Sequence, residues 1–269
     1  NYVDFLREKR QNKDSTIRKN IAALSKLLKI AVQKGHLLAF PIMERPKEPE
    51  AKVRWIGQHD PQEEQKITQI FTQWGKLDHV DFFQGMLDTG MRTAEMRLFT
   101  EKQVNFNFHD YNTGKDFPVI MLEDWQCKNR QARNIPITKR FGAILKRRMT
   151  GNPKALVFPY TKNWFSNQFL KLRDILGKSE DEGFSPHICR HTWASRLVQR
   201  GISLPVLMKL GGWKTMSQVM VYANLAPTNL VAAINILDRF NGDNSPLNVV
   251  PDINNIDDLS VDVGRKVAL

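Results

Sequence analysis

The chain has 269 residues, of which 41% are hydrophobic, a content typical of a soluble globular protein with a substantial core. No apolar run approaches the roughly 18 residues of a membrane-spanning helix, and the N-terminal segment has no signal-like stretch, so we expect a cytoplasmic or nucleoid-associated protein with no membrane partner. The 40 Lys and Arg exceed the 28 Asp and Glu, and the resulting net charge of +12 favours nucleic acid as the partner.

Residues 1–56 are predicted to form a small helical unit followed by a linker. Residues 1–57 hold 13 Lys or Arg against 6 Asp or Glu, a surplus of seven positive charges. The stretch DSTIRKNIAALSKLLKIAVQKG predicts a helix with Asp14 or Ser15 as N-cap. Three prolines in the following FPIMERPKEPE indicate an extended linker, so we place the boundary near Gly57. Four lysines lie mostly off the apolar stripe of this helix and are candidate DNA contacts: Lys19, Lys26, Lys29 and Lys34.

Residues 57–240 are predicted to form one larger domain that is mainly α with a small antiparallel β-meander, an α+β fold. Helical patterns cover PQEEQKITQIFTQW and DFFQGMLDTGMRTAEMRLFT, the second interrupted at Gly90. Three β-type runs follow between turn-forming segments: QVNFNF, FPVIML and RNIPIT. Helical patterns then return in RFGAILKRRM, NWFSNQFLKLRDIL, SPHICRHTWASRLVQRG, SLPVLMKLGG and TMSQVMVYANL.

Residues 241–269 differ in composition from the rest of the chain. They contain 5 Asp against 2 basic residues, many Asn, and only short apolar patches. Such a segment cannot bury a core of its own. We expect a tail that either docks on a neighbouring protomer or has no role.

Several residues in the larger domain are suited to holding a phosphate. His187 and Arg190 stand three apart, and they share a helix face if the helix begins that early. Arg92 stands at the expected opening of a helix, where a planar guanidinium can clamp an anion through two hydrogen bonds. The other candidates are a lysine at the tip of a predicted hairpin, an indole, and a tyrosine nine residues after the indole: Lys128, Trp213 and Tyr222.

These segments resemble the catalytic domain of the tyrosine recombinases, the phage integrase family to which lambda integrase belongs. The family pattern is an Arg in a TG-x-R-x-x-E box, a hairpin Lys, H-x-x-R, and LG-x-(H or W) followed nine residues later by a Tyr. Here these stand in order as TGMRTAE, Lys128, HICR, LGGW and Tyr222. The resemblance covers roughly residues 57–240, and the lysine-rich helix before it resembles the family's core-DNA-binding domain by position and charge. It implies catalytic roles for Arg92, Lys128, His187, Arg190, Trp213 and Tyr222.

Other residues compete for these roles or support them. Three cations lie close in sequence to Lys128: Arg130, Arg133 and Lys139. His191 competes with His187, but the family pattern favours His187, so His191 is expected to be a supporting residue. Glu95, one turn after Arg92, is expected to orient that arginine rather than to act in catalysis. The indole of Trp213 stands where the family more often has His, and it donates a hydrogen bond but cannot act as an acid or base.

By this resemblance, Tyr222 attacks a DNA phosphodiester and forms a 3′-phosphotyrosyl link with release of a 5′-hydroxyl. Arg92 and Arg190 would neutralise the phosphate, His187 would hold or accept the tyrosine proton, and Lys128 would protonate the departing oxygen. The link conserves the bond energy, so we expect no ATP, metal or other cofactor. The two cysteines also lack metal-ligand spacing.

We therefore interpret the chain as a site-specific DNA recombinase, an integrase of a phage or another mobile element in a bacterial host cell. The implied partners are double-stranded DNA with attachment or core sites, three further copies in a homotetramer, and accessory proteins that bend DNA or set directionality. Two alternatives remain open. A type IB topoisomerase shares this chemistry but relaxes DNA without exchanging strands. A non-catalytic helical DNA-binding regulator would have no need of Tyr222.

Overall fold

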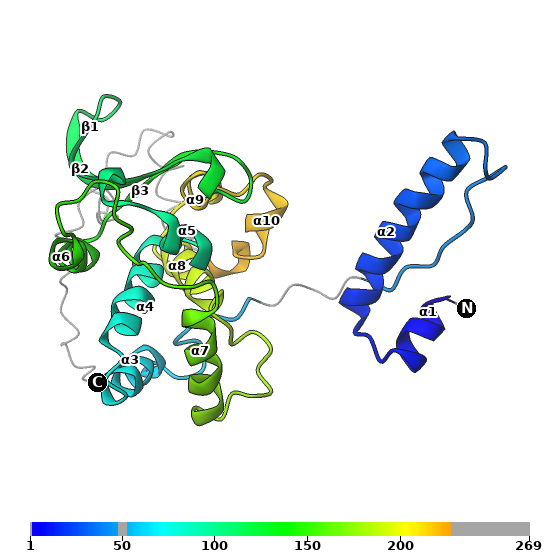
Figure 1. Ribbon diagram of the computed structural model, residues 1–269, viewed down its shortest axis with the longest axis horizontal. Coiled ribbons are helices and arrows are strands. Elements are labelled where there is room, and N and C mark those ends of the chain that lie inside the picture. Colours follow the sequence, from blue (N-terminus) through cyan, green and yellow to red (C-terminus); the bar gives the residue numbers. More distant parts are fainter. Residues whose placement is uncertain (1, 48–52, 227–269) are drawn as a thin grey trace, which may run out of the picture. The chain divides into compact units, whose positions relative to one another are not determined.

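The computed structural model describes residues 2–47 and 53–226 of the chain (Figure 1). The chain divides into two compact units, residues 1–52 and residues 53–269. Within the described ranges, no helix combines the length and the apolar character that crossing a membrane requires. The predicted tail, residues 241–269, lies outside the described residues.

The smaller unit is built around one long helix at the predicted place. Its elements are α1 (Tyr2–Asp4), the π-helical segment η1 (Phe5–Lys9) and α2 (Asp14–Gln33). The sequence patterns did not predict the first two. Lys13 occupies the N-cap position of α2 and no side chain caps the helix, so the predicted cap by Asp14 or Ser15 is wrong.

One side of α2 is buried and the other carries its lysines. Ile17 and Ile21 are buried against Leu6 of η1, which makes the small core of this unit. The candidate DNA contacts are all exposed on the remaining surface of the helix or just after it: Lys19, Lys26, Lys29 and Lys34.

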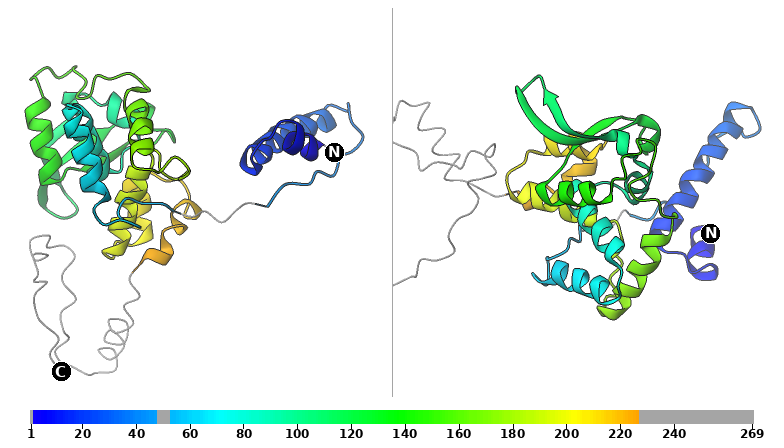
Figure 2. Two further views of the ribbon diagram at one scale, coloured as in Figure 1. Left: turned by 90° about the horizontal axis from the view of Figure 1, so that it is seen from below. Right: turned by 60° about the vertical axis from the view of Figure 1, so that its left-hand side comes forward.

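The larger unit is mainly helical, and α3 to α9 occur where the sequence predicted them. The helices are α3 (Glu63–Gln73), α4 (Leu77–Thr89), α5 (Thr93–Leu98), α6 (Lys139–Arg148), α7 (Trp164–Ile175), α8 (Ile188–Gln199), α9 (Leu204–Gly211) and α10 (Ser217–Met220). Three short 3-10 turns accompany them: η2 (Glu101–Gln103), η3 (Asp124–Gln126) and η4 (Ala223–Leu225). Helix α4 contacts α3, α6 and α8, so it is central to the helical packing (Figures 1 and 2).

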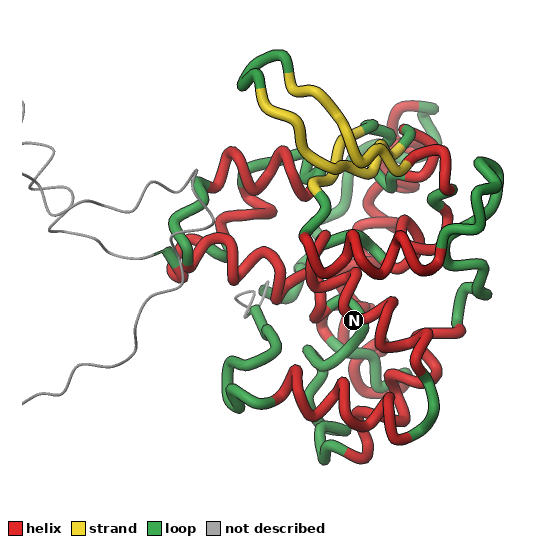
Figure 3. Tube along the Cα trace, turned by 90° about the vertical axis from the view of Figure 1, so that its left-hand side faces the viewer, coloured by secondary structure: helices red, strands yellow, loops and turns green. Residues whose placement is uncertain are grey.

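A three-stranded antiparallel sheet confirms the predicted meander. Its strands are β1 (Val104–Asp110), β2 (Lys115–Leu122) and β3 (Arg133–Pro136), in the order β1–β2–β3. The β1–β2 hairpin projects beyond the helices (Figure 3), whereas β3 contacts α9. The connection from β2 to β3, residues 123–132, therefore begins and ends close to the helical part of the unit.

Two apolar clusters hold the larger unit together. In the main core, the ring of Phe82 on α4 lies 5.3 Å from that of Phe158 and 4.8 Å from that of Phe165 on α7, measured between centroids. A second cluster around Trp193 joins α8, α9 and the segment that contains Tyr222. Full burial of an apolar side chain of this size contributes about 1.5–3 kcal/mol, so this second cluster fixes the C-terminal elements on α8.

Residues 53–56, predicted to belong to the linker, are part of the larger unit. The Arg54 side chain binds Glu63 of α3 and Asp181, and the backbone N–H of Ile56 donates to Thr192 Oγ1 of α8 at 2.9 Å. The predicted boundary near Gly57 thus lies a few residues after the division before residue 53.

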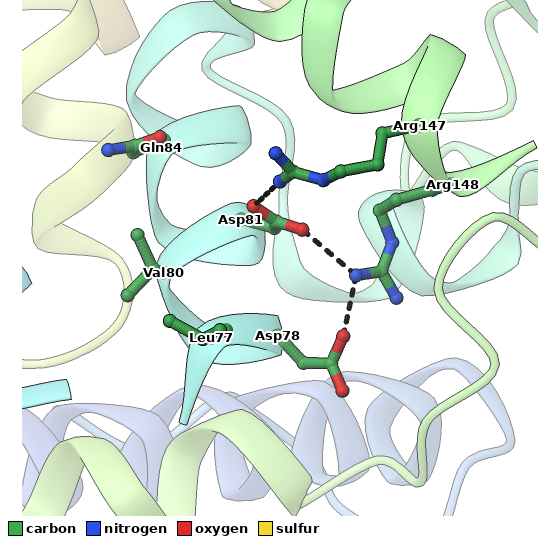
Figure 4. Close-up of a pocket in the computed structure, with 7 residues that line it drawn as sticks. All are labelled: Leu77, Asp78, Val80, Asp81, Gln84, Arg147 and Arg148. Atoms are coloured by element: carbon green, nitrogen blue, oxygen red, sulfur yellow. Dashed lines mark hydrogen bonds and ion pairs between the residues drawn. The ribbon is translucent and has the colours of Figure 1, made fainter. Parts of the chain in front are cut away.

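The arginines of α6 are bound by carboxylates of the same unit. Arg148 Nη1 lies 2.6 Å from Asp78 Oδ1 and 3.0 Å from Asp81 Oδ2, while Arg147 contacts the other oxygen of Asp81. Figure 4 shows these four side chains around a cavity of about 670 Å³. Arg140 likewise pairs with carboxylates of α3 and α4. These contacts fasten α6 to its neighbours, and the charges of its three arginines are paired within the fold.

Candidate active site

The turn between α4 and α5 positions Arg92. Helix α4 ends at Thr89, and Gly90 follows with a φ of +63°, a left-handed conformation that glycine adopts without steric cost. A Cβ atom at Gly90 would lie 2.4 Å from the Trp193 ring, so no side chain fits there. Arg92 takes the N-cap position of α5, and its backbone N–H donates to Glu95 Oε2 at 2.8 Å. Arg92 therefore opens a helix, as the motif predicted.

Glu95 is a buried carboxylate shared by two arginines. It is 1% exposed, and Oε1 accepts from Arg92 Nη1 at 2.8 Å, while Arg133 donates to Oε1 at 3.2 Å and to Oε2 at 2.8 Å. Burial alone would raise its pKa, but the hydrogen bonds and charges of Arg133 and then Arg92 outweigh burial and hold the pKa below its ordinary value. Glu95 is therefore ionised at neutral pH.

Arg190 of α8 is a buried cation with no carboxylate partner among the described residues. It is 1% exposed, and its Nη1 and Nη2 donate to the carbonyl oxygens of Gly90 at 2.8 Å and Gly211 at 2.6 Å. The guanidinium carbon lies 4.0 Å from the ring centroid of Trp213, a cation–π contact. Burial, followed by repulsion from Arg92, lowers the pKa of Arg190. The lost hydration is not replaced by an ion pair, so an incoming anion would find a cation already desolvated.

Two glycines allow Trp213 to lie over that guanidinium. Helix α9 ends at Gly211, and Gly212 follows with a φ of +64°. A Cβ atom at Gly211 would lie 2.0 Å from Trp213 Cζ3, and one at Gly212 would lie 3.1 Å from the Arg133 side chain. Trp213 also stacks on Trp193 at 6.3 Å between centroids. The LGGW motif is therefore a close-packed turn that anchors the indole in the wall of a cavity.

Lys128 lies exposed in the β2–β3 connection. Its neighbour Asn129 donates from Nδ2 to the carbonyl oxygen of Gly212 at 2.8 Å, which ties this loop to the turn before the indole. Of the competing cations, Arg133 points inward with a side chain only 7% exposed. Arg130, like Arg133, is not among the residues that line the cavity beside Lys128.

His187 stands at the N-cap of α8, exposed at the cavity, one residue before the helix begins. Surrounding protein atoms displace water from its ring, and the nearby His191, Arg190 and further cations add to this effect, which lowers the pKa of His187 to about 4. The ring is therefore neutral at pH 7 and has one nitrogen free to accept a proton.

Five of the six predicted catalytic residues line one cavity of about 360 Å³. These five are Arg92, Lys128, His187, Arg190 and Trp213. The sequence motifs did not single out the other four lining residues, Asn129, Gly212, Lys214 and Gln218, although Gly212 stands within LGGW. The sequence feature that could have identified them is their position, because each lies within five residues of a predicted catalytic residue. The lining holds four cationic side chains and no carboxylate, so the cavity is suited to an anion.

Tyr222 does not line this cavity. It is 1% exposed, and its Oη lies 2.7 Å from His191 Nδ1. His187 is the residue predicted to hold the tyrosine proton, but the imidazole in contact with the phenol is that of His191. The predicted continuous helix is also wrong here, since α10 ends two residues before Tyr222 and η4 begins after it. Burial raises the pKa of Tyr222 to about 12, with Arg190 acting in the opposite direction.

The structure shows no metal cluster in the ranges it describes. No group of three or more His, Cys, Asp and Glu side chains within residues 2–47 and 53–226 is arranged to hold a metal ion. Cys127 and Cys189 are both buried free thiols. The candidate DNA contacts Lys19, Lys26, Lys29 and Lys34 belong to the other compact unit and are exposed there.

Sequence comparison finds relatives of one kind. The model of the phage integrase family matches residues 57–229. The integrase of Salmonella phage P22 is 26% identical over 242 residues, which cover 84% of this chain and 58% of that protein. The integrase of Haemophilus phage HP1 is 27% identical over 148 residues, which cover 55% of this chain and 37% of that protein. The chain thus spans little more than half of the first relative and about a third of the second. The tyrosine recombinase XerA of Saccharolobus solfataricus is 25% identical over 223 residues, which cover 83% of this chain and 68% of that protein.

Solved structures of similar fold are those of an integrase and a site-specific recombinase, each in complex with DNA. The Tn1549 transposon integrase in complex with a circular intermediate DNA matches with a TM-score of 0.61 and 18% identity, covering 87% of this chain and 82% of that one. The XerH site-specific recombinase bound to palindromic difH substrate matches with a TM-score of 0.61 and 14% identity. The match covers 88% of this chain and 71% of that one. These likenesses confirm the mainly helical fold with a small sheet.

The protonation of His187 is open to a direct test. Because its folded pKa of about 4 lies below the ordinary 6.5, protonation favours the unfolded chain. The contribution to stability is complete above pH 6.5 and is lost as the pH falls toward 4. An NMR titration of the ring, assigned with His187→Gln, should give a midpoint near pH 4, and wild type should lose stability relative to that variant over this range. A midpoint at or above 6.5 in the free protein would contradict this environment.

Proposed function

The chain belongs to the phage integrase family, and on that basis we propose that it is a site-specific DNA recombinase of the tyrosine type. One observation carries the proposal: a cavity lined by four cations and no carboxylate lies beside a buried tyrosine that contacts a histidine. In the proposed reaction the protein cleaves and rejoins DNA through a 3′-phosphotyrosyl intermediate. The intermediate conserves the energy of the phosphodiester, so rejoining needs no ATP.

The cations of the cavity are proposed to hold the scissile phosphate. Arg92 gives one side-chain nitrogen to Glu95, and Arg190 gives two to backbone carbonyls, which leaves further N–H groups on both for the nonbridging oxygens. The indole of Trp213 adds one donor. Because these groups are fixed before DNA arrives, they stabilise the developing charge without reorganising, an effect that typically gives about 10²–10³-fold per donor.

The proton transfers are assigned to the two histidines and the lysine. His191 holds the phenol of Tyr222 in its buried position, where the raised pKa keeps the hydroxyl protonated and unreactive. The phenol must leave that position to reach the phosphate, and neutral His187 then accepts its proton. The Tyr222 oxygen forms a bond to phosphorus, the bond from phosphorus to the 5′ oxygen breaks, and Lys128 gives that oxygen a proton. Attack by a 5′-hydroxyl of a partner strand reverses these steps and completes recombination.

The proposed partners follow from this reaction. The substrate is double-stranded DNA with attachment or core sites, and exchange between two duplexes requires four active sites, hence a homotetramer on DNA. Accessory proteins that bend DNA or set directionality are further proposed partners, and the site of action is the nucleoid of a bacterial host. The topoisomerase and regulator alternatives gain no support, because the named relatives are integrases and recombinases.

Replacement of the nucleophile tests the proposal. On a nicked duplex that carries the attachment site, wild type should form a covalent protein–DNA adduct, and sequencing of the trapped strand should place the protein on a 3′ phosphate. Tyr222→Phe should form no adduct while its DNA affinity changes less than about 3-fold, since the lost hydroxyl faces His191 and not the cavity. Tyr160→Phe is the matched control, because burial raises the pKa of Tyr160 to about 12 as well. An adduct formed by Tyr222→Phe would refute the assignment.

The α2 lysines are proposed to contact DNA phosphates, and salt dependence of binding tests this. A protein that contacts Z phosphates shows a slope of about −0.9Z in log K against log salt. Joint replacement of Lys19, Lys26, Lys29 and Lys34 by Gln should therefore reduce that slope by up to about 3–4 units. The control variant, Arg140→Gln with Arg147→Gln, removes charges that carboxylates already neutralise, so its slope should not change. An undiminished slope in the lysine variant would show that these side chains face away from DNA.

A further inference from the structure

Arg133 is a charged residue on the inward face of a strand. It opens β3 and shares a face of that strand with Ile135, which is buried. Its side chain is 7% exposed. Moving a guanidinium out of water is costly unless it is paired and hydrogen-bonded. The position therefore depends on the groups that Arg133 contacts.

Those groups belong to three separate segments that form the walls of the cavity. Arg133 donates from both terminal nitrogens to Glu95, at 2.8 and 3.2 Å, and Glu95 also holds Arg92. Its Nη1 lies 3.2 Å from the sulfur of Cys127, the residue before the loop lysine. Its guanidinium lies against the backbone of Gly212, where a Cβ atom would come within 3.1 Å of it. One side chain thus joins the start of α5, the β2–β3 loop and the turn after α9.

The ion pair between Arg133 and Glu95 changes the net charge around Arg92. Glu95 carries one negative charge, and with Arg92 alone as partner it would cancel the positive charge that faces the cavity. Arg133 supplies a second positive charge from inside the protein, so the group of three residues keeps a net charge of +1. Arg92, with a side chain 21% exposed against 7% for Arg133, is the member through which that charge reaches a phosphate.

We propose that Arg133 is a positioning residue for strand cleavage, which neutralises Glu95 so that Arg92 remains available to the DNA phosphate. It does not touch the substrate itself, because it is not among the residues that line the cavity. It also fixes the base of the Lys128 loop against Gly212. This inference rests on the proposed function, because it concerns the rate of the proposed cleavage.

Single-turnover adduct formation on the nicked duplex tests the proposal in three variants. Arg133→Met leaves Glu95 to neutralise Arg92, so the rate at saturating protein should fall about 10–100-fold, as expected when a reacting group is displaced. DNA affinity should change less than about 3-fold, since the outward-facing cations remain. Adding Glu95→Gln to Arg133→Met removes the unpaired carboxylate, so the double variant should react at least about 5-fold faster than Arg133→Met, recovering part of the 10–100-fold loss. Arg133→Lys keeps the charge without the two-nitrogen contact and should be intermediate.

A purely structural role predicts a different result. If Arg133 only stabilised the fold, the double variant would lose at least as much as the single one, and no rate would be recovered. Arg140→Met is the matched control, because Arg140 also bridges two carboxylates but lies away from the cavity, and its cleavage rate should equal that of wild type.

The outcomes separate this inference from the function on which it rests. Absence of a Tyr222-dependent adduct in wild type would refute the proposed function. A wild-type adduct together with an unchanged rate in folded Arg133→Met, or no recovery in the double variant, would refute the role of Arg133 alone. If none of the three variants folds, Arg133 is a stability residue and the proposal is wrong.

Discussion

The burial of Arg190 is the constraint on which the site depends. A guanidinium that is 1% exposed needs hydrogen-bond acceptors, and Arg190 finds them in the carbonyl oxygens of Gly90 and Gly211. Both acceptors lie in tight turns that only small residues fit, because Trp193 and Trp213 occupy the space where a Cβ would be. The same contacts therefore hold the Arg92 turn and the indole turn against one side chain of α8. Chain segments about 100 residues apart meet there, since the bond to Gly90 spans that separation.

The distribution of charge follows a single pattern. Away from the cavity, arginines such as Arg148 are bound by carboxylates and fasten helices together. At the cavity, no carboxylate lines the wall, and the one nearby acid, Glu95, is buried behind Arg92 and balanced by a second arginine. The net charge of +12 is thus less informative than its arrangement. Part of the positive charge stabilises the fold, and part of it is left unpaired where a phosphate can reach it.

The sequence predicted helices α2 to α9, the meander and the identity of five cavity residues, because each depends on local periodicity or on a short motif. It did not predict the state of Tyr222, since its burial and its contact with His191 arise from the packing of distant elements. Arg133 stands two residues before the buried Ile135, a strand spacing that places it on the inward face, although the motifs offer it only as an alternative to Lys128. The spacing shows that the Arg133 side chain points inward, but it does not identify Glu95, 38 residues away, as its partner.

In the proposed reaction, Arg190 is a cation kept desolvated that neutralises the charge of the scissile phosphate. This role can be measured by comparing wild type and Arg190→Met on ordinary DNA and on DNA with a neutral methylphosphonate at the cleaved position. On ordinary DNA the variant should form the Tyr222 adduct about 10²–10³-fold more slowly than wild type. On the methylphosphonate substrate, which has no charge to neutralise, the difference between the two proteins should shrink to less than about 10-fold. An equal defect on both substrates would show that Arg190 acts through packing alone, and would contradict the account.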